Sequence, residues 1–226
     1  MTGVLASVDD VASALWLVET SVAIIDLKQP AHGALGALPL DTVRDIVARV
    51  GQRKPLSATI GDLPLQPQLI AEACRDMAAT GIDYIKFGIF QAGNAHACFA
   101  ALQPLTQRGV RLVAVLFADL QPDFALIERA AQVGLHGVML DTCDKRRGSL
   151  LENLPRARLS EFVHLARQHG LLCGLAGSLR LADIPALLPL QPDYLGFRGA
   201  LCRNHQRNAA LDYDAVWQVL RQVNGA

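Results

Sequence analysis

Charged side chains recur at the ends of short apolar segments of this chain. Asp26 and Lys28 stand two residues apart at the end of one segment, Lys86 lies within another, and Asp119 and Asp141 end two more. An ionisable group is costly to bury in apolar surroundings unless it is paired. A structural ion-pair network explains any one of these residues, but it explains their concentration at neighbouring segment ends less well.

The two lysines suggest covalent chemistry with a carbonyl substrate. A lysine is nucleophilic only as the free amine, and at a pKa of ~10.4 only about one molecule in 2,500 is neutral at pH 7. Apolar walls and a second nearby cation disfavour the ammonium form. Lys28 and Lys86 therefore suit a Schiff-base mechanism in which Asp26 or Asp141 moves protons. Their spacing does not decide which lysine forms the imine.

Small residues near the end of the chain suggest phosphate binding. Gly177-Ser178 and Gly199-Ala200 would let backbone N–H groups approach an anion, although such residues are also ordinary turn formers. Arg198 and Lys145 would add positive charge. We interpret Arg203 and Arg207 as surface charges. Candidate substrate- or phosphate-binding residues are Ser57, Asp119, Gly177, Ser178, Arg198, Gly199 and Ala200.

These residues belong to a repeating pattern of apolar segments. The segments are continuous rather than alternating, as in strands that a parallel sheet buries on both faces. They are Val4–Val8, Val22–Lys28, Pro55–Asp62, Tyr84–Phe90, Arg111–Asp119, Gly137–Thr142, Leu172–Ser178 and Tyr194–Ala200. Helical patterns between them include Gln66–Ala79, Ala95–Gln107, Asp123–Val133, Ser160–His169 and Tyr213–Val223.

Eight strands with intervening helices predict a compact α/β fold, the (β/α)8 TIM barrel, as a single catalytic domain over residues 1–226. Gly81, Gly134 and Gly170 each fit a left-handed turn between a helix and the next strand, which marks a repeated unit. A doubly wound sheet is the main alternative. No glycine-rich dinucleotide or P-loop fingerprint follows the first strand, which disfavours that alternative.

The composition of the chain limits the classes of partner that we expect. The chain has 226 residues, 51% hydrophobic and 19% charged, with zero formal net charge and 5% aromatic residues. Balanced charge and few aromatics disfavour nucleic acid or a membrane surface as partner. Five scattered cysteines and the lack of a signal-peptide pattern favour reduced thiols in the cytoplasm. A homo-oligomer is left open.

Several motifs together resemble the (5-formylfuran-3-yl)methyl phosphate synthase family. The matching segments run in order through nearly the whole chain: Asp26-Leu27-Lys28-Gln29-Pro30, Gly33-Ala34-Leu35-Gly36-Ala37, Ser57–Asp62, Tyr84–Lys86, Met139–Thr142, Leu175–Ser178 and Arg198-Gly199-Ala200, followed by Cys202 and by Arg207-Asn208. Each segment alone is weak evidence for this family, but the combination of segments is specific to it. The sequence departs from the family pattern in the loop with Gln29, Ala31 and His32. This difference affects contacts of the loop rather than the lysines.

The resemblance implies a (β/α)8 barrel that condenses two molecules of glyceraldehyde 3-phosphate into a phosphorylated furan aldehyde. That product is a precursor of methanofuran or of a related cofactor of bacterial one-carbon metabolism. By resemblance, Lys28 is the Schiff-base lysine and Lys86 the proton acceptor, while Asp26, Asp141 and Lys145 match further active-site positions. The iminium is itself the electron sink, so we expect no metal or other cofactor.

Other functions fit the same residues. A class I aldolase or isomerase acting on another phosphosugar would use both lysines but would release no phosphate from triose phosphate. A non-catalytic barrel that binds a phosphorylated metabolite would have lysines of ordinary pKa. A scaffold acting through surface helices would need a large apolar stripe, and none is evident.

Overall fold

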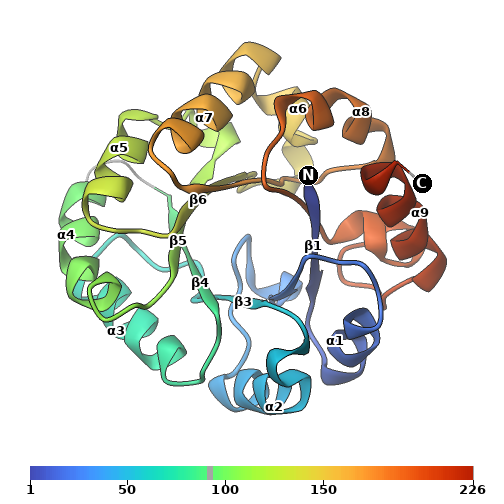
Figure 1. The fold of residues 1–226 in the computed structure, drawn as a ribbon, viewed down its shortest axis with the longest axis horizontal. Coiled ribbons are helices and arrows are strands. Elements are labelled where there is room, and N and C mark those ends of the chain that lie inside the picture. Colours follow the sequence, from blue (N-terminus) through green and yellow to red (C-terminus); the bar gives the residue numbers. More distant parts are fainter. Residues whose placement is uncertain (91–93, 226) are drawn as a thin grey trace.

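Eight parallel strands close into a barrel, and the helices surround it (Figure 1). The structure, a computed structural model, describes residues 1–90 and 94–225. The strands pair in sequence order, and β1 pairs with β8 to close the ring. They are β1 (Gly3–Val8), β2 (Ile24–Leu27), β3 (Leu56–Thr59), β4 (Tyr84–Ile89), β5 (Leu112–Phe117), β6 (Gly137–Asp141), β7 (Leu172–Leu175) and β8 (Tyr194–Phe197). This architecture confirms the predicted (β/α)8 barrel.

The helices cover the outside of the strands. They are α1 (Val11–Val18), α2 (Leu40–Val50), α3 (Pro67–Ala78), α4 (Ala95–Thr106), α5 (Ala125–Gln132), α6 (Leu150–Asn153), α7 (Arg156–Gln168), α8 (Ile184–Leu187) and α9 (Tyr213–Asn224). The predicted strands overlap all eight observed strands, and the predicted helices overlap α3, α4, α5, α7 and α9. Gly81, Gly134 and Gly170 have φ angles of 83°, 77° and 67°, which confirms the expected left-handed turns.

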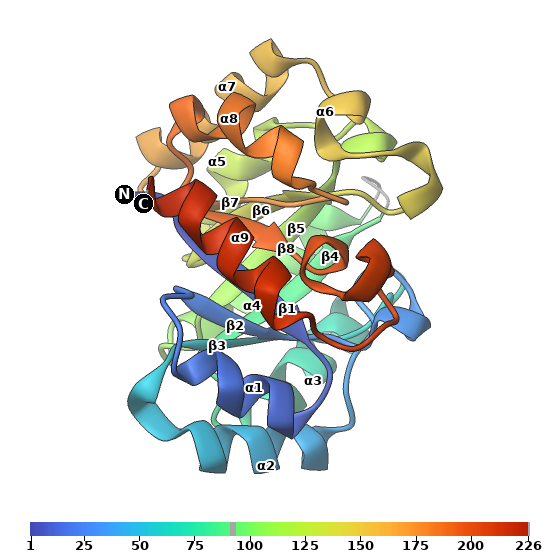
Figure 2. The same cartoon turned by 90° about the vertical axis from the view of Figure 1, so that its right-hand side faces the viewer.

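The last helix shows how sequence pattern and packing agree. The Asp212 side chain caps α9 by accepting hydrogen bonds from the backbone N–H groups of Asp214 and Ala215. Val216, Val219, Leu220 and Val223 follow helical spacing and form its buried face. This face packs α9 against β1 on the outside of the barrel (Figures 1 and 2).

The barrel interior has an apolar floor beneath a polar layer. Leu5, Ile24 and Met139 belong to a buried apolar cluster inside the barrel. Ser7, Asp26 and Asp141 stand two residues further along the same strands, so they face the same interior one layer nearer the strands' C-terminal ends. The fold therefore collects polar side chains where the barrel opens. Among the helices of the described residues, none is both long and apolar enough to cross a membrane.

Candidate active site

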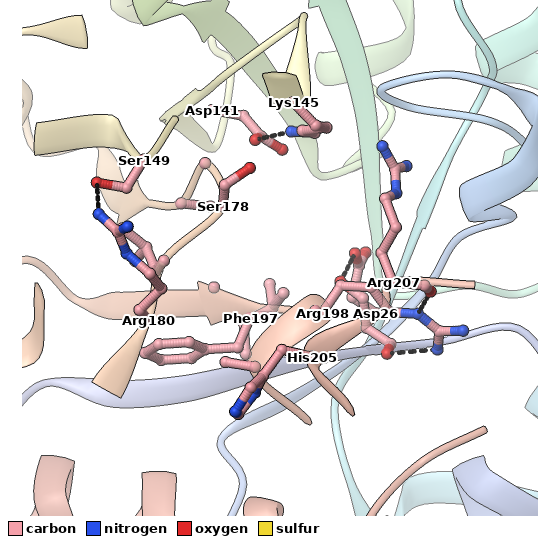
Figure 3. A pocket seen from close by; sticks show the side chains of 18 of the residues that line it. Asp26, Asp141, Lys145, Ser149, Ser178, Arg180, Phe197, Arg198, His205 and Arg207 are labelled. Atoms are coloured by element: carbon pink, nitrogen blue, oxygen red, sulfur yellow. Dashed lines mark hydrogen bonds and ion pairs between the residues drawn. The ribbon is translucent and has the colours of Figure 1, made fainter. Parts of the chain in front are cut away.

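A cavity of about 550 Å³ opens where the strands end (Figure 3). Its lining comes from six of the strands or the loops that follow them. The lining includes Ser7, Asp26, Lys28, Lys86, Asp141, Lys145, Gly177, Ser178, Arg198, Gly199, Ala200, His205 and Arg207. The cavity thus brings together ten of the twelve site residues predicted from the sequence.

Strand register builds the environment of Asp26. In the parallel ladder Asp26 lies beside Ser7 of β1 and Ser57 of β3. Both hydroxyls donate to its carboxylate, at 2.8 Å and 2.7 Å, and the Lys86 ammonium lies 2.6 Å from Oδ1. Burial opposes ionisation of Asp26, but the charges of Lys86 and Lys28 hold its pKa below the usual value. Asp26 therefore stays an anion within a fully buried layer.

Lys86 is almost completely buried on β4. Burial lowers the pKa of Lys86, and the positive charge of Lys28 lowers it further, while Asp26 opposes both effects. A lysine with a lowered pKa gives up its proton more readily near neutral pH. Lys86 can thus exchange a proton with a group in the cavity or with Asp26.

Asp141 organises a second cationic group at the end of β6. The Lys145 ammonium lies 2.6 Å from Asp141 Oδ1 and also donates to the backbone oxygen of Thr142. The Lys28 ammonium lies 3.8 Å from the other carboxylate oxygen. Burial opposes ionisation, but Lys145 and Lys28 lower the pKa of Asp141 to about 2. Lys28 is therefore held more loosely by its carboxylate than Lys86 is by Asp26.

Lysines are concentrated at this site. The chain has four lysines and seventeen arginines. Lys28, Lys86 and Lys145 line the cavity, whereas Lys54 donates to the backbone oxygen of Val22. Arginine stays protonated in proteins, whereas a lysine can lose its proton when buried. The distribution places primary amines where amine chemistry would need them.

Two predicted site residues are not part of the cavity lining. Ser57 donates to Asp26 and so positions that carboxylate. Asp119 accepts hydrogen bonds from the backbone N–H groups of Cys143 and Asp144, at 2.7 Å and 2.8 Å. Asp119 thereby holds the loop that follows β6. Both residues support the site from behind its lining.

The loops after β7 and β8 border one side of the cavity. Gly177 has a φ of 113°, and a Cβ there would lie 2.9 Å from the Thr142 Cγ2 and 3.0 Å from the Thr142 nitrogen. Only glycine fits this close approach without strain. Gly199 begins a short 3₁₀ helix, and the first N–H groups of a helix have no partners inside it. These small residues therefore allow a close approach of the backbone on this side of the cavity.

Arg198 and Arg207 both line the cavity but differ in their hydrogen bonds. All three guanidinium nitrogens of Arg198 donate within the protein, to the backbone oxygens of Arg207 and Ser7 and to the Asp9 carboxylate. Arg207, interpreted above as a surface charge, instead lines the cavity, as does His205. Charge and periodicity gave no role to Arg207, because the long loop after β8 folds back over the barrel; the family resemblance did include Arg207-Asn208.

Aromatic side chains fill the opposite side of the barrel mouth. Phe90 and Phe117 stack with ring centroids 4.5 Å apart and pack with Leu35 in the interior apolar cluster. A Cβ on Gly88 would lie 2.5 Å from Phe90 and 2.9 Å from Leu35, so this packing is tight. The lining of the cavity accordingly comes from β1, β2, β4, β6, β7 and β8 or the loops after them, and does not include these aromatic side chains.

Sequence comparison identifies relatives over nearly the whole chain. The model of the 4-HFC-P synthase family matches residues 4–220. A (5-formylfuran-3-yl)methyl phosphate synthase from Methanopyrus kandleri is 35% identical over 207 residues, covering 86% of this chain and 87% of the relative. The synthase of the same name from Archaeoglobus fulgidus is 31% identical over 236 residues, covering 98% and 99%. A protein of Methylorubrum extorquens, provisionally given that name, is 43% identical over 219 residues, covering 97% and 90%.

Solved structures share the fold at low sequence identity. Phosphoribosyl anthranilate isomerase from Thermotoga maritima superposes with a TM-score of 0.71 at 12% identity, and both chains are covered completely. The 3-hexulose-6-phosphate synthase from Salmonella typhimurium gives 0.67 at 13% identity, covering 99% of each chain. These neighbours support the barrel architecture.

Proposed function

Because this chain belongs to the 4-HFC-P synthase family, we propose that it condenses two molecules of glyceraldehyde 3-phosphate into (5-formylfuran-3-yl)methyl phosphate. The formulae balance when one phosphate and two molecules of water are released. Lys28 is the Schiff-base residue in this proposal. The product would supply the furan of methanofuran or of a related one-carbon cofactor.

One observation carries the proposal: two lysines and two buried aspartates meet in a single cavity. Lys86 pairs with Asp26 at 2.6 Å, whereas Lys28 lies 3.8 Å from Asp141. The looser contact favours Lys28 as the nucleophile, because an amine loses less electrostatic stabilisation when a distant carboxylate is its partner. The tighter pair suits proton transfer.

The proposed first half of the reaction activates both triose phosphates. One isomerises to its ketone form, whose carbonyl carbon bonds to the neutral amine of Lys28 while its oxygen leaves as water, which gives an iminium. Lys86 takes the proton from C2 of the other molecule, and the phosphate on C3 of that molecule then leaves, which gives a three-carbon enol that keeps its aldehyde. Asp26 can receive the proton from Lys86, since the two groups share a short hydrogen bond.

The proposed second half joins the two molecules. The terminal carbon of the enol attacks the iminium carbon, which forms the new carbon–carbon bond and leaves a ketone beside the retained aldehyde. The C1 hydroxyl of the imine-forming molecule then closes the ring on that ketone carbon, and elimination frees the Lys28 amine. Loss of the ring hydroxyl as the second water makes the ring aromatic.

The phosphate of the imine-forming molecule fits the loops after β7 and β8. Gly177, Ser178, Gly199 and Ala200 line this side of the cavity. Barrels of this kind often bind phosphate at the corresponding loops. Small residues there allow backbone N–H groups to reach the anion.

Incubation with glyceraldehyde 3-phosphate alone tests the proposal. We expect phosphate release together with the ultraviolet absorbance of a furan aldehyde. Borohydride added during turnover should attach the triose to Lys28, as peptide mapping would show. Lys54→Arg is the matched control, because Lys54 does not belong to the cavity lining and this variant should react and trap normally.

Three outcomes would contradict the proposal. Attachment of the triose to Lys86 or Lys145 would overturn the assignment of Lys28. Trapping without phosphate release would favour an aldolase or isomerase acting on another phosphosugar. No trapping and no turnover would favour a barrel that only binds a phosphorylated metabolite.

A further inference from the structure

Among the residues that the structure describes, the Arg207 side chain lines the cavity and uses little of its hydrogen-bonding capacity. Its Nη2 donates to the backbone oxygen of Gly33 at 2.8 Å. A guanidinium has five N–H donors, so one such bond leaves several for a ligand. None of the ion pairs found among residues 1–90 and 94–225 includes Arg207. This arginine is half-buried and points toward the part of the cavity that contains Lys145 (Figure 3).

The loop that carries Arg207 is held in place from several sides. Arg198 donates to the backbone oxygen of Arg207 at 2.8 Å, and Arg198 is itself anchored by an ion pair with Asp9 at 2.9 Å. Within the loop, the Arg203 nitrogen donates to the Ala210 oxygen. A guanidinium on an anchored loop is prepositioned for a ligand, which lowers the entropic cost of binding.

The side chains that line the cavity carry more positive than negative charge. The lining has two carboxylates, Asp26 and Asp141, and six lysine and arginine residues: Lys28, Lys86, Lys145, Arg180, Arg198 and Arg207. Lys86 pairs with Asp26, and Lys28 and Lys145 share Asp141. Arg198 pairs with Asp9, and Arg180 pairs with Glu152 and Asp183. Within residues 1–90 and 94–225, Arg207 is the one of these six that takes part in no ion pair. Lys28 has its role as the imine-forming residue, so Arg207 is the cation that the proposed chemistry does not yet use.

Arg207 lies apart from the small residues that border the other side of the cavity. Figure 3 shows Ser178 and Arg207 on opposite sides, with the Asp141–Lys145 pair between them. The charge of Arg207 nevertheless contributes to lowering the pKa of Lys145, so the two cations are within electrostatic reach. An anion beside Arg207 would feel both positive charges.

We propose that Arg207 binds the phosphate of the second triose phosphate, across the cavity from the phosphate position at the ends of β7 and β8. This proposal rests on the condensation proposed above, in which two phosphorylated molecules occupy the cavity together. Two phosphate dianions repel each other, so each needs its own cluster of donors. The planar guanidinium matches phosphate through paired N–H···O bonds.

A binding experiment tests the position without the reaction. Glycerol 3-phosphate has no carbonyl and forms no imine, so calorimetric titration counts phosphate positions alone. We expect two equivalents per chain for the wild type and one for Arg207→Ala. Arg203→Ala is the matched control, because Arg203 is exposed on the same loop and does not belong to the cavity lining; it should bind two. One equivalent for the wild type, or two for Arg207→Ala, would overturn the proposal.

A kinetic experiment separates the two molecules of substrate. In Arg207→Ala the glyceraldehyde 3-phosphate concentration that gives half-maximal borohydride trapping should stay at the wild-type value. The concentration for half-maximal phosphate release should rise about tenfold or more, as for loss of a charge-assisted hydrogen bond. Arg207→Lys should recover part of this difference. An equal rise in both concentrations would assign Arg207 to the imine-forming molecule and overturn the proposal.

The two experiments keep the two proposals distinguishable. If the wild type binds two equivalents of glycerol 3-phosphate but releases no phosphate from glyceraldehyde 3-phosphate, the condensation is contradicted and the Arg207 position is not. If the wild type turns over normally but Arg207→Ala still binds two equivalents of glycerol 3-phosphate, only the Arg207 position is contradicted. Equal unfolding midpoints for Arg207→Ala and Arg203→Ala would show that the loop still folds.

Discussion

The ammonium nitrogen of Lys86 lies 2.6 Å from Oδ1 of Asp26, and neither side chain is more than 2% exposed. Two oppositely charged groups that are this close and are buried away from solvent attract each other far more strongly than they would in water. Their short hydrogen bond also gives a proton a direct route between amine and carboxylate. The pair therefore combines a structural role with a route for the proton that the proposed mechanism removes from carbon.

Replacing the carboxylate tests this double role. Asp26→Asn should lower kcat about 100-fold or more, because the amide cannot receive the proton that Lys86 removes. Imine trapping on Lys28 should persist, since the nucleophile is unchanged. Steady-state phosphate release and borohydride trapping measure the two effects separately. Asp76→Asn, at an exposed position on α3, should change neither quantity, and loss of trapping in Asp26→Asn would contradict the assigned roles.

Sequence reasoning located the part of the site that lies on strands. Asp26, Lys28, Lys86 and Asp141 stand out because a charge inside an apolar run needs a partner or a function. Their positions follow from a fold that places strand ends at one mouth. The barrel could be predicted for the same reason, since each strand and helix carries its own local pattern.

The rest of the site depends on long-range geometry. Ser7 acquires its role only because the parallel pairing of β1 with β2 sets it in register with Asp26. Arg207 enters the cavity because its loop folds back and contacts Gly33, far away in sequence. Asp119 was predicted to bind substrate, but its carboxylate accepts two backbone N–H groups of the neighbouring loop. No local pattern encodes these three arrangements.

Acid should destabilise the protein through Asp141. Its pKa is about 2 in the folded protein, below the ordinary value of 3.8, so the folded state favours the ionised form. This stabilisation is complete above about pH 4–5 and is lost as the pH falls toward 2, with a magnitude of about 2 kcal/mol. Urea unfolding at several pH values measures it. Asp141→Asn should show a smaller loss of unfolding free energy across this range, and an equal loss would contradict the prediction.

Removing Asp119 should activate a neighbouring thiol. Burial raises the pKa of Cys143, and the negative charge of Asp119 raises it further. In Asp119→Asn the thiolate fraction should rise, so alkylation of Cys143 should accelerate about two- to tenfold at pH 8. Mass spectrometry after timed iodoacetamide treatment measures the rate. Cys74 and Cys98 are buried and serve as internal controls, and an unchanged rate at Cys143 would show that Asp119 does not influence this loop.

A methyl group at Gly177 should damage the loop after β7. Its φ of 113° is unfavourable for any other residue, and a Cβ would meet Thr142 at 2.9 Å, beside Asp141. Gly177→Ala should therefore destabilise the protein by about 1–3 kcal/mol and raise the substrate concentration needed for half-maximal trapping. Gly170→Ala is the matched control, because Gly170 also has a positive φ of 67° but no atoms near its missing Cβ. Thermal unfolding of both variants compares a position in the ordinary left-handed region, Gly170, with one that has a less favourable φ and also a close contact with Thr142. Equal losses in the two variants would mean that the close approach to Thr142 does not matter.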